Sequence, residues 1–294
     1  MHKTNSVTLS VLLIGTVSIL VAVAGNALVL AAIWRSPSLR TSSYILLAVL
    51  ASTDLLTWMT TQPFYVASKF TEIRNGKPQS FCIITGTAAV AVEGIGSYLV
   101  LITLLTTTFM AIERWLHMAR RSLLNVRRVC MICSIILIVP VPFVAFRIQS
   151  IMECHQLNDI DVATSVAGVV CLTIASVAYF KVYGIILRHL QQVRANEPTQ
   201  NFGQPAIHLV KYKRSVCTIL CILALFYVTY IPLIVFTPVL SSLNEITDKF
   251  SMVFNALIGM HLLSSSLNPV LYCLRMKDIR DGVKQIVKRI VCNN

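Results

Sequence analysis

The stretch SYLVLITLLTTTFMAI at residues 97–112, followed directly by Glu113, Arg114 and Trp115, decides the fold of this chain. It continues an apolar region that begins near residue 81, and a helix of about 20 apolar residues crosses the roughly 30 Å of membrane hydrocarbon. A guanidinium at the mouth of such a span is costly, so it is kept by an internal carboxylate or for a partner in the cytosol. The triplet is therefore a candidate switch.

The composition of the whole chain is that of a membrane protein. Hydrophobic residues make up 56% of the 294 positions and charged residues 13%, whereas soluble domains carry about 25% charged residues. Apolar windows predict seven spans, near residues 7–33, 44–66, 81–112, 129–149, 162–187, 216–240 and 250–273. We expect an all-α membrane fold, a seven-transmembrane helix bundle that forms a single domain over residues 1–294.

Lys and Arg concentrate on one side of the predicted membrane, which places the N-terminus outside. The inner segments hold Arg35, Arg40, Arg120, Arg121, Arg127, Arg128, Arg188, Arg194, Lys211, Lys213, Arg214, Arg275, Lys277, Arg280, Lys284, Lys288 and Arg289. Acidic and basic residues balance in the outer segments, where Arg147, Asp159 and Asp161 are counted. Because the formal charge of +13 is spread over short segments beside the membrane, nucleic acid is excluded, and anionic lipids or an acidic cytosolic partner fit better.

Asp54 stands inside the second predicted span, where a carboxylate is expensive unless it is paired, hydrated or neutral. It must therefore face the bundle interior. Other spans carry oxygen and amide groups that could surround it with water or a small cation: Asn26, Thr103, Thr107, Ser264, Ser265 and Asn268. The alternative is a static polar network that only fixes helix packing.

Pro232 and Pro269 predict hinges in the sixth and seventh spans. Proline removes a backbone hydrogen bond and kinks a helix, and an aromatic side chain above the kink, such as Tyr230, can couple an outer cavity to the inner end. Kinks without switching are also common in membrane helices.

The segment 276–291 places Ile279, Val283, Ile286, Val287 and Ile290 on one face and Lys and Arg on the other. This pattern predicts a short amphipathic helix in the headgroup plane. Cys292 follows it in a basic setting that suits palmitoylation; an unmodified cysteine is the alternative.

Five motifs, taken together, resemble the rhodopsin-like (class A) G-protein-coupled receptors over nearly the whole chain. They are Gly25-Asn26, Leu50-Ala51-Ser52-Thr53-Asp54, Glu113-Arg114-Trp115, Phe226 to Pro232 with Tyr230 at the toggle position, and Asn268-Pro269-Val270-Leu271-Tyr272. The resemblance implies a plasma-membrane receptor, not an enzyme, that binds an extracellular ligand and activates a heterotrimeric G protein. It also implies a sodium ion and water near Asp54 and no other cofactor.

The resemblance assigns roles at the inner face. Glu113 would pair with Arg114 at rest, and in the active state Tyr179 and Tyr272 would swing toward Arg114. A cleft would then admit the C-terminal helix of a G protein, a helix-in-groove interaction. At the outer face, Cys82 and Cys154 would form a disulfide or remain two free thiols. Cys82 lies further from Arg114 than the family's cysteine, whose position here is Ala89.

The ligand of such a receptor would bind in the outer half of the bundle, but its class stays open. Candidate pocket residues are Glu93, Gly96, Ser97, Val100, Tyr230, Leu233, Asn255 and Gly259. Amine receptors carry an Asp where this chain has Gly96, and an opsin needs a Schiff-base lysine where it has Leu262, so retinal is excluded. Glu93, taken as the only acid in the outer half of a span, either contacts the ligand, is protonated, or faces a base such as Lys69.

Two other protein classes are weighed against the receptor. A seven-span transporter or ion or proton translocator would need further intramembrane acids or broken helices, and only Asp54 and Glu93 are expected within spans. A seven-span metal hydrolase would need clustered His and Asp ligands, but the His residues lie mostly in loops, tails or span ends. We therefore expect no metal site of this kind.

Overall fold

A computed structural model of the chain describes residues 2–67, 94–119, 124–152, 158–195, 224–225, 227–239 and 248–292, and within these ranges every regular element is helical. The named helices are α1 (His2–Arg35), α2 (Ser42–Leu56), α5 (Gly96–Met118), α6 (Val126–Ile138), α7 (Val141–Met152), α8 (Asn158–Ala195), α10 (Asp248–Arg275) and α11 (Lys277–Cys292). Shorter elements are a 3-10 turn over Pro37–Leu39 and a π-helical turn over Thr57–Thr61.

Six helices of the described part are long and apolar enough to cross a membrane. They cover Ser18–Arg35, Ser42–Ala67, Gly96–Met118, Val126–Ser150, Asp159–Arg188 and Met252–Leu274, and the apolar helix Tyr227–Val239 is shorter. The prediction of an all-α membrane fold is thereby confirmed. The expected third span ended at residue 112, but α5 continues to Met118, because the charged triplet belongs to the helix and does not end it.

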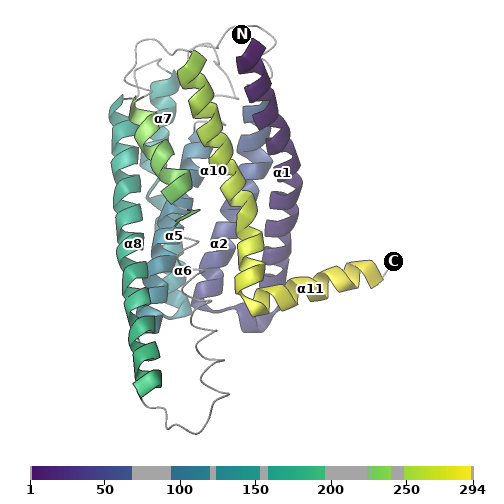
Figure 1. Cartoon of the computed structure of the whole chain (residues 1–294), viewed down its shortest axis with the longest axis vertical. Helices are drawn as coiled ribbons and strands as arrows, with labels where there is room; N and C mark the ends of the chain where they lie inside the picture. The colour runs from purple at the N-terminus through teal and green to yellow at the C-terminus, as the bar shows by residue number, and fades with distance from the viewer. Residues whose placement is uncertain are drawn as a thin grey trace.

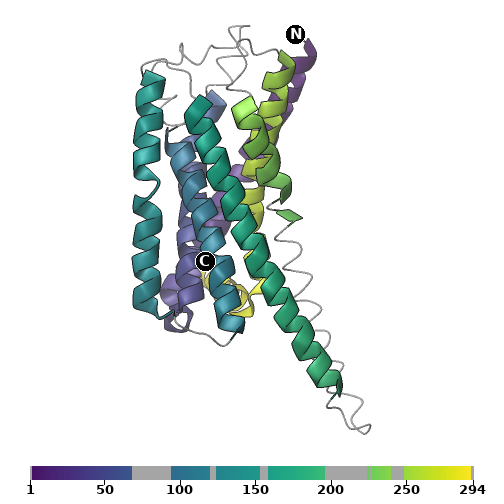
Figure 2. The ribbon, with the colours of Figure 1, turned by 90° about the vertical axis from the view of Figure 1, so that its left-hand side faces the viewer.

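The helices stand side by side, with the N-terminal end of α1 at one end of the bundle and α11 projecting sideways at the other (Figure 1). Figure 2 shows α8 running well beyond the neighbouring helices at the end where α11 lies. Where α6 gives way to α7, Pro140 has no N–H to donate, and the chain makes a turn before α7 begins at Val141.

Gly25 lets α1 lie directly against α10. A Cβ atom at this position would stand 2.8 Å from Cβ and 2.9 Å from Cγ of Pro269, which is shorter than van der Waals contact. The two motifs that meet there, Gly25-Asn26 and Asn268-Pro269, therefore lie beside each other.

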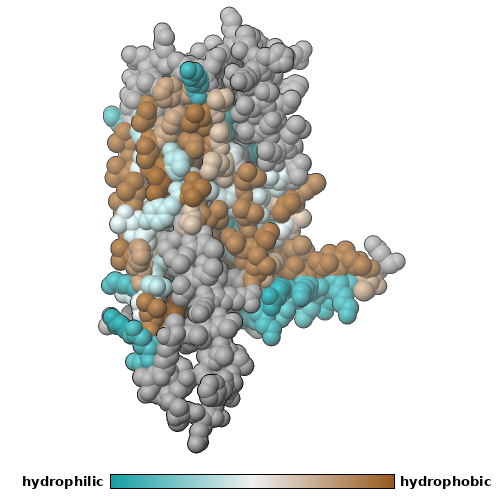
Figure 3. Space-filling model, viewed as in Figure 1, coloured by the Kyte–Doolittle hydropathy of each residue, from teal (hydrophilic) through white to brown (hydrophobic). Residues whose placement is uncertain are grey.

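The outer surface of the bundle is largely apolar, as a lipid-facing surface must be. Figure 3 shows hydrophobic side chains over the helices of the bundle and along one face of α11, with hydrophilic side chains along the opposite face of α11. Ile279 and Ile286 are the buried residues of α11, whereas Ile290 is exposed. Tyr44 on α2 donates a hydrogen bond to Asp278 Oδ2 at 2.9 Å, which ties α11 to the bundle.

Candidate functional site

Asp54 lies in the interior of the bundle with 1% of its surface exposed. Its Oδ2 accepts a hydrogen bond from Asn268 Nδ2 of α10 at 2.8 Å, and the Ser265 side chain lies close to the carboxylate. A buried carboxylate in an apolar bundle needs such partners. The expected inward orientation of Asp54 is therefore what the structure has.

The other predicted members of this network are buried nearby but make separate contacts. Asn26, fully buried, donates to Ala22 O at 2.9 Å, and its Oδ1 has no partner among the described residues. Thr103 donates to Thr53 Oγ1 at 3.4 Å, and Ser264 donates to His261 O at 2.6 Å.

A cavity of about 80 Å³, called the inner cavity, is lined by most of these groups together with Tyr179 and Tyr272. Its polar lining includes Thr103, Thr107, Tyr179, Thr229, Tyr230, Ser264, Ser265, Asn268 and Tyr272. The hydroxyl oxygen of Tyr272 is buried and has no hydrogen-bond partner among the described residues. The cavity is large enough for a few waters, so it could hydrate the Tyr272 hydroxyl and the residues around Asp54.

The charged triplet differs in one contact from the resting arrangement that the resemblance implies. Glu113 is buried and its Oε1 accepts a hydrogen bond from Ser43 of α2 at 2.8 Å. Among the described residues Glu113 forms no ion pair with Arg114. The short Ser43 side chain reaches the carboxylate from a neighbouring helix, a contact that spacing along one helix could not predict.

Trp115 contacts α8 rather than lying at an exposed helix end. Lys181 Nζ lies 4.6 Å from the centroid of the Trp115 ring, within the range of a cation–π interaction. The same ring packs on a buried cluster that includes Tyr179 and Val182. Trp115 therefore adds a contact between α5 and α8.

Tyr230, at the predicted toggle position, lies between the two halves of the bundle. It lines the inner cavity and also a larger outer cavity, and its ring makes an edge contact with His261 at 4.9 Å between centroids. Pro232 is half-buried in the helix Tyr227–Val239, and α10 continues unbroken through Pro269. Phe226 lies outside the described residues.

The larger cavity, called the outer cavity because residues of the predicted ligand pocket line it, has a volume of about 180 Å³. Of the predicted pocket residues, Gly96, Ser97, Val100, Tyr230 and Leu233 line it. Asn255 does not line it but accepts a hydrogen bond at 3.1 Å from Tyr65, which does. Gly259 is not part of the lining, and Glu93 lies outside the described residues.

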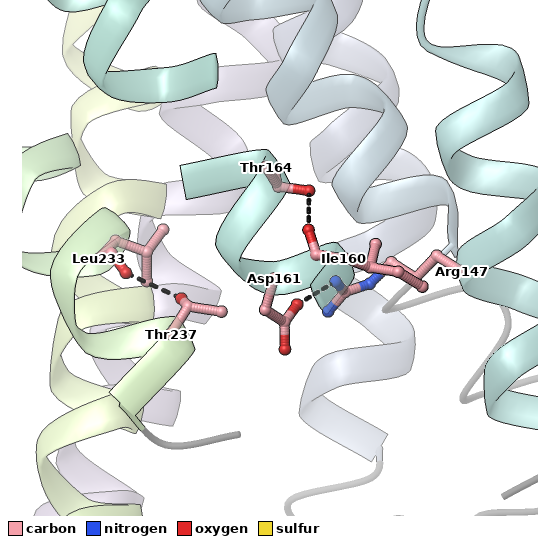
Figure 4. A network of polar contacts seen from close by, with 6 residues as sticks. All are labelled: Arg147, Ile160, Asp161, Thr164, Leu233 and Thr237. Atoms are coloured by element: carbon pink, nitrogen blue, oxygen red, sulfur yellow. Dashed lines mark hydrogen bonds and ion pairs between the residues drawn. The ribbon is translucent and has the colours of Figure 1, made fainter. Parts of the chain in front are cut away.

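Arg147 and Asp161 form a buried ion pair in the wall of the outer cavity, which the sequence analysis missed (Figure 4). Arg147 comes from α7 and Asp161 from the first turn of α8, and 8% and 4% of their surfaces are exposed. Both were counted with the outer segments, but they lie in the candidate spans Val126–Ser150 and Asp159–Arg188. The expectation that Glu93 is the only acid in the outer half of a span was therefore wrong. The helical spacing of Asp161, Thr164 and Ser165, which all line the cavity, is a signal that could have found them.

The predicted cysteine sites remain predictions. Cys82 and Cys154 lie outside the described residues, and Cys292 is a free, exposed cysteine at the end of α11. In the part of the chain that the structure describes, no group of three or more His, Cys, Asp or Glu side chains could hold a metal ion.

One comparison with known proteins identifies a family. The family model described as 7 transmembrane receptor (rhodopsin family) matches residues 25–272, most of the chain. The comparison with individual curated proteins gives no match.

Proposed function

Because the chain belongs to the rhodopsin family of seven-transmembrane receptors, we propose that it is a G-protein-coupled receptor with seven spans. The helix Tyr227–Val239 is then the described part of the sixth span, predicted over 216–240. As a single domain over residues 1–294, the chain acts by binding and not by catalysis, in the plasma membrane with its N-terminus outside.

The proposed ligand site is the outer cavity, and the proposed coupling site is the opposite end of the bundle. Tyr230 supports this link because it is buried and contributes to the walls of both cavities. A ligand that moves Tyr230 changes the space available to Tyr179 and Tyr272 in the inner cavity. This shared side chain is the observation that carries the proposal.

The proposed G-protein site includes Glu113, Arg114, Trp115, Tyr179 and Tyr272. The Lys181 to Trp115 contact supports a role for Trp115 in holding α5 against α8. The Asp54 to Asn268 hydrogen bond supports a polar connection between α2 and α10, in which a sodium ion would bind Asp54. We infer from the family resemblance that this sodium site collapses on activation.

The amphipathic α11 is proposed to lie on the inner membrane surface as the eighth helix. Its apolar face meets lipid, its basic face meets anionic headgroups, and palmitoylation of Cys292 would add a second anchor.

Nucleotide exchange tests the proposal directly. The full chain in lipid nanodiscs is mixed with purified heterotrimeric G proteins, and binding of a non-hydrolysable GTP analogue is followed. We expect exchange above the rate with empty nanodiscs, a loss of that excess in Arg114→Ala, and no loss in Arg127→Ala, a matched exposed arginine at the start of α6. Absence of exchange with every G protein class, together with solute or ion flux in liposomes, would favour a transporter instead.

A further inference from the structure

The outer cavity contains buried polar atoms that have no protein partner. Gln62 Oε1, Thr61 Oγ1 and His261 Nδ1 are each buried without a hydrogen bond among the described residues, and all three residues line the cavity. Gln62 is 2% exposed and His261 8%. Since a buried polar atom without a partner costs about 1–3 kcal/mol, these atoms point to a bound molecule or water as their partner.

Several hydroxyl groups in the cavity wall already donate a hydrogen bond to another part of the protein. Thr57, Thr164 and Thr237 each donate to a carbonyl of their own helix at 2.8 to 2.9 Å. Tyr65 donates to Asn255. A hydroxyl oxygen that has donated its hydrogen can still accept, so the three threonine hydroxyls, like Gln62 Oε1, offer acceptors to a molecule in the cavity.

The two charges in the described lining cancel. The Arg147 guanidinium donates to the Asp161 carboxylate (Figure 4), so this part of the wall has no net charge. An ionised ligand would enter an apolar bundle without a counterion, and an unpaired buried charge is strongly unfavourable. The ion pair therefore selects against charged ligands.

The remaining walls are apolar and set the size of what fits. Val100, Leu104, Ile234, Phe254 and Ile258 contribute to the lining. A cavity of about 150 Å³ holds a benzene ring, so about 180 Å³ suits a molecule of one or two fused rings.

From these four observations we infer that the outer cavity binds a small amphipathic molecule with no net charge and at least two hydrogen-bond donors. This inference rests on the proposed function only for the location of the ligand site. Ionised amines and carboxylates are disfavoured where the described residues line the cavity, and the donors of the ligand meet the acceptors around Gln62 and Thr237.

Matched probes test the inference by equilibrium dialysis against the full chain in nanodiscs, with binding to empty nanodiscs subtracted. The probes are a dihydroxynaphthalene, its dimethoxy ether, a hydroxynaphthoate and an aminomethyl naphthol. We expect the diol to bind, and the ether and both charged probes to bind about tenfold more weakly. Loss of a hydrogen bond in the ether, or burial of an unpaired charge in the charged probes, should raise the dissociation constant by about a factor of ten. Equal binding of ether and diol, tighter binding of a charged probe, or no binding of the diol overturns the inference.

Variants locate the binding. Gln62→Leu and Thr237→Val should each weaken diol binding about tenfold, whereas Thr173→Val should not, because Thr173 makes the same backbone contact on the exposed face of α8. Asp161→Asn removes one negative charge from the described lining, so it should strengthen binding of the hydroxynaphthoate relative to its binding to the unchanged chain. Unchanged diol binding in both Gln62→Leu and Thr237→Val would overturn the inference without needing the Asp161 variant to fold.

The nucleotide exchange assay separates this inference from the proposed function. Exchange without diol binding refutes the ligand chemistry and leaves the receptor assignment standing. Diol binding without exchange for any G protein refutes the coupling and leaves the ligand chemistry standing.

Discussion

Asn268 of α10 donates a hydrogen bond to the buried carboxylate of Asp54 on α2, at 2.8 Å and across 214 positions of sequence. One hydrogen bond thus joins two motifs that lie far apart in the sequence. The contact joins the second and seventh predicted spans near the inner cavity that Tyr179, Tyr230 and Tyr272 line.

Asn268→Ala should lower the free energy of unfolding by about 1.5–3 kcal/mol, because it removes a hydrogen bond to a buried acidic group. Unfolding of the detergent-solubilised chain measures this. In a double-mutant cycle with Asp54→Asn, the coupling energy should be at least about 0.5 kcal/mol. Additive losses would mean that the two side chains stabilise the fold independently.

Sodium should stabilise the chain if it binds at Asp54. At a sodium concentration of 100 times the dissociation constant, the gain is about 2.7 kcal/mol, visible as a higher Tm in NaCl than in the chloride of a large organic cation. Asp54→Asn should remove this difference. Asp278→Asn, a substitution on α11 away from the bundle interior, should preserve it; a sodium effect that survives in Asp54→Asn contradicts the prediction.

Lys181→Met and Trp115→Leu should show coupling of about 0.5–1 kcal/mol in a double-mutant cycle, since Lys181 Nζ lies 4.6 Å from the indole centroid. Lys181→Arg keeps the positive charge and should retain most of this coupling. A cycle without measurable coupling would show that Trp115 stabilises the α5 and α8 contact by packing alone.

Gly25→Ala should destabilise the chain by about 1–3 kcal/mol, because its methyl group would overlap Pro269 and push α1 away from α10. Gly184→Ala in α8 is the control, since an added Cβ there meets no atom within 4 Å. That variant should be neutral or up to about 1 kcal/mol more stable, as alanine favours helix over glycine. Equal effects of the two substitutions would refute the close contact.

Much of the fold could be predicted because it follows from local patterns. Apolar runs of membrane length predicted the helices now seen from Ser42 to Ala67 and from Asp159 to Arg188. The spacing of Ile279 and Ile286 predicted an amphipathic helix over 276–291, where α11 covers Lys277–Cys292. The inward orientation of Asp54 followed equally from the cost of a carboxylate in lipid.

Contacts between helices could not be predicted in the same way. Ser43 at Glu113 and Lys181 over Trp115 depend on which helices are neighbours and how each is rotated. Arg147 and Asp161 were counted with the outer segments but are buried in the wall of a cavity.

The sequence by itself determined that this is an all-α membrane protein of the rhodopsin family, because the length of the apolar runs and the order of the motifs do not depend on how the helices pack. Only the tertiary structure decided that the described wall of the outer cavity is neutral and rich in hydrogen-bond acceptors. The physical reason is that Arg147 and Asp161 neutralise each other only once α7 and α8 bring their side chains into contact, and the partners of each hydroxyl are settled by the folded helices around it.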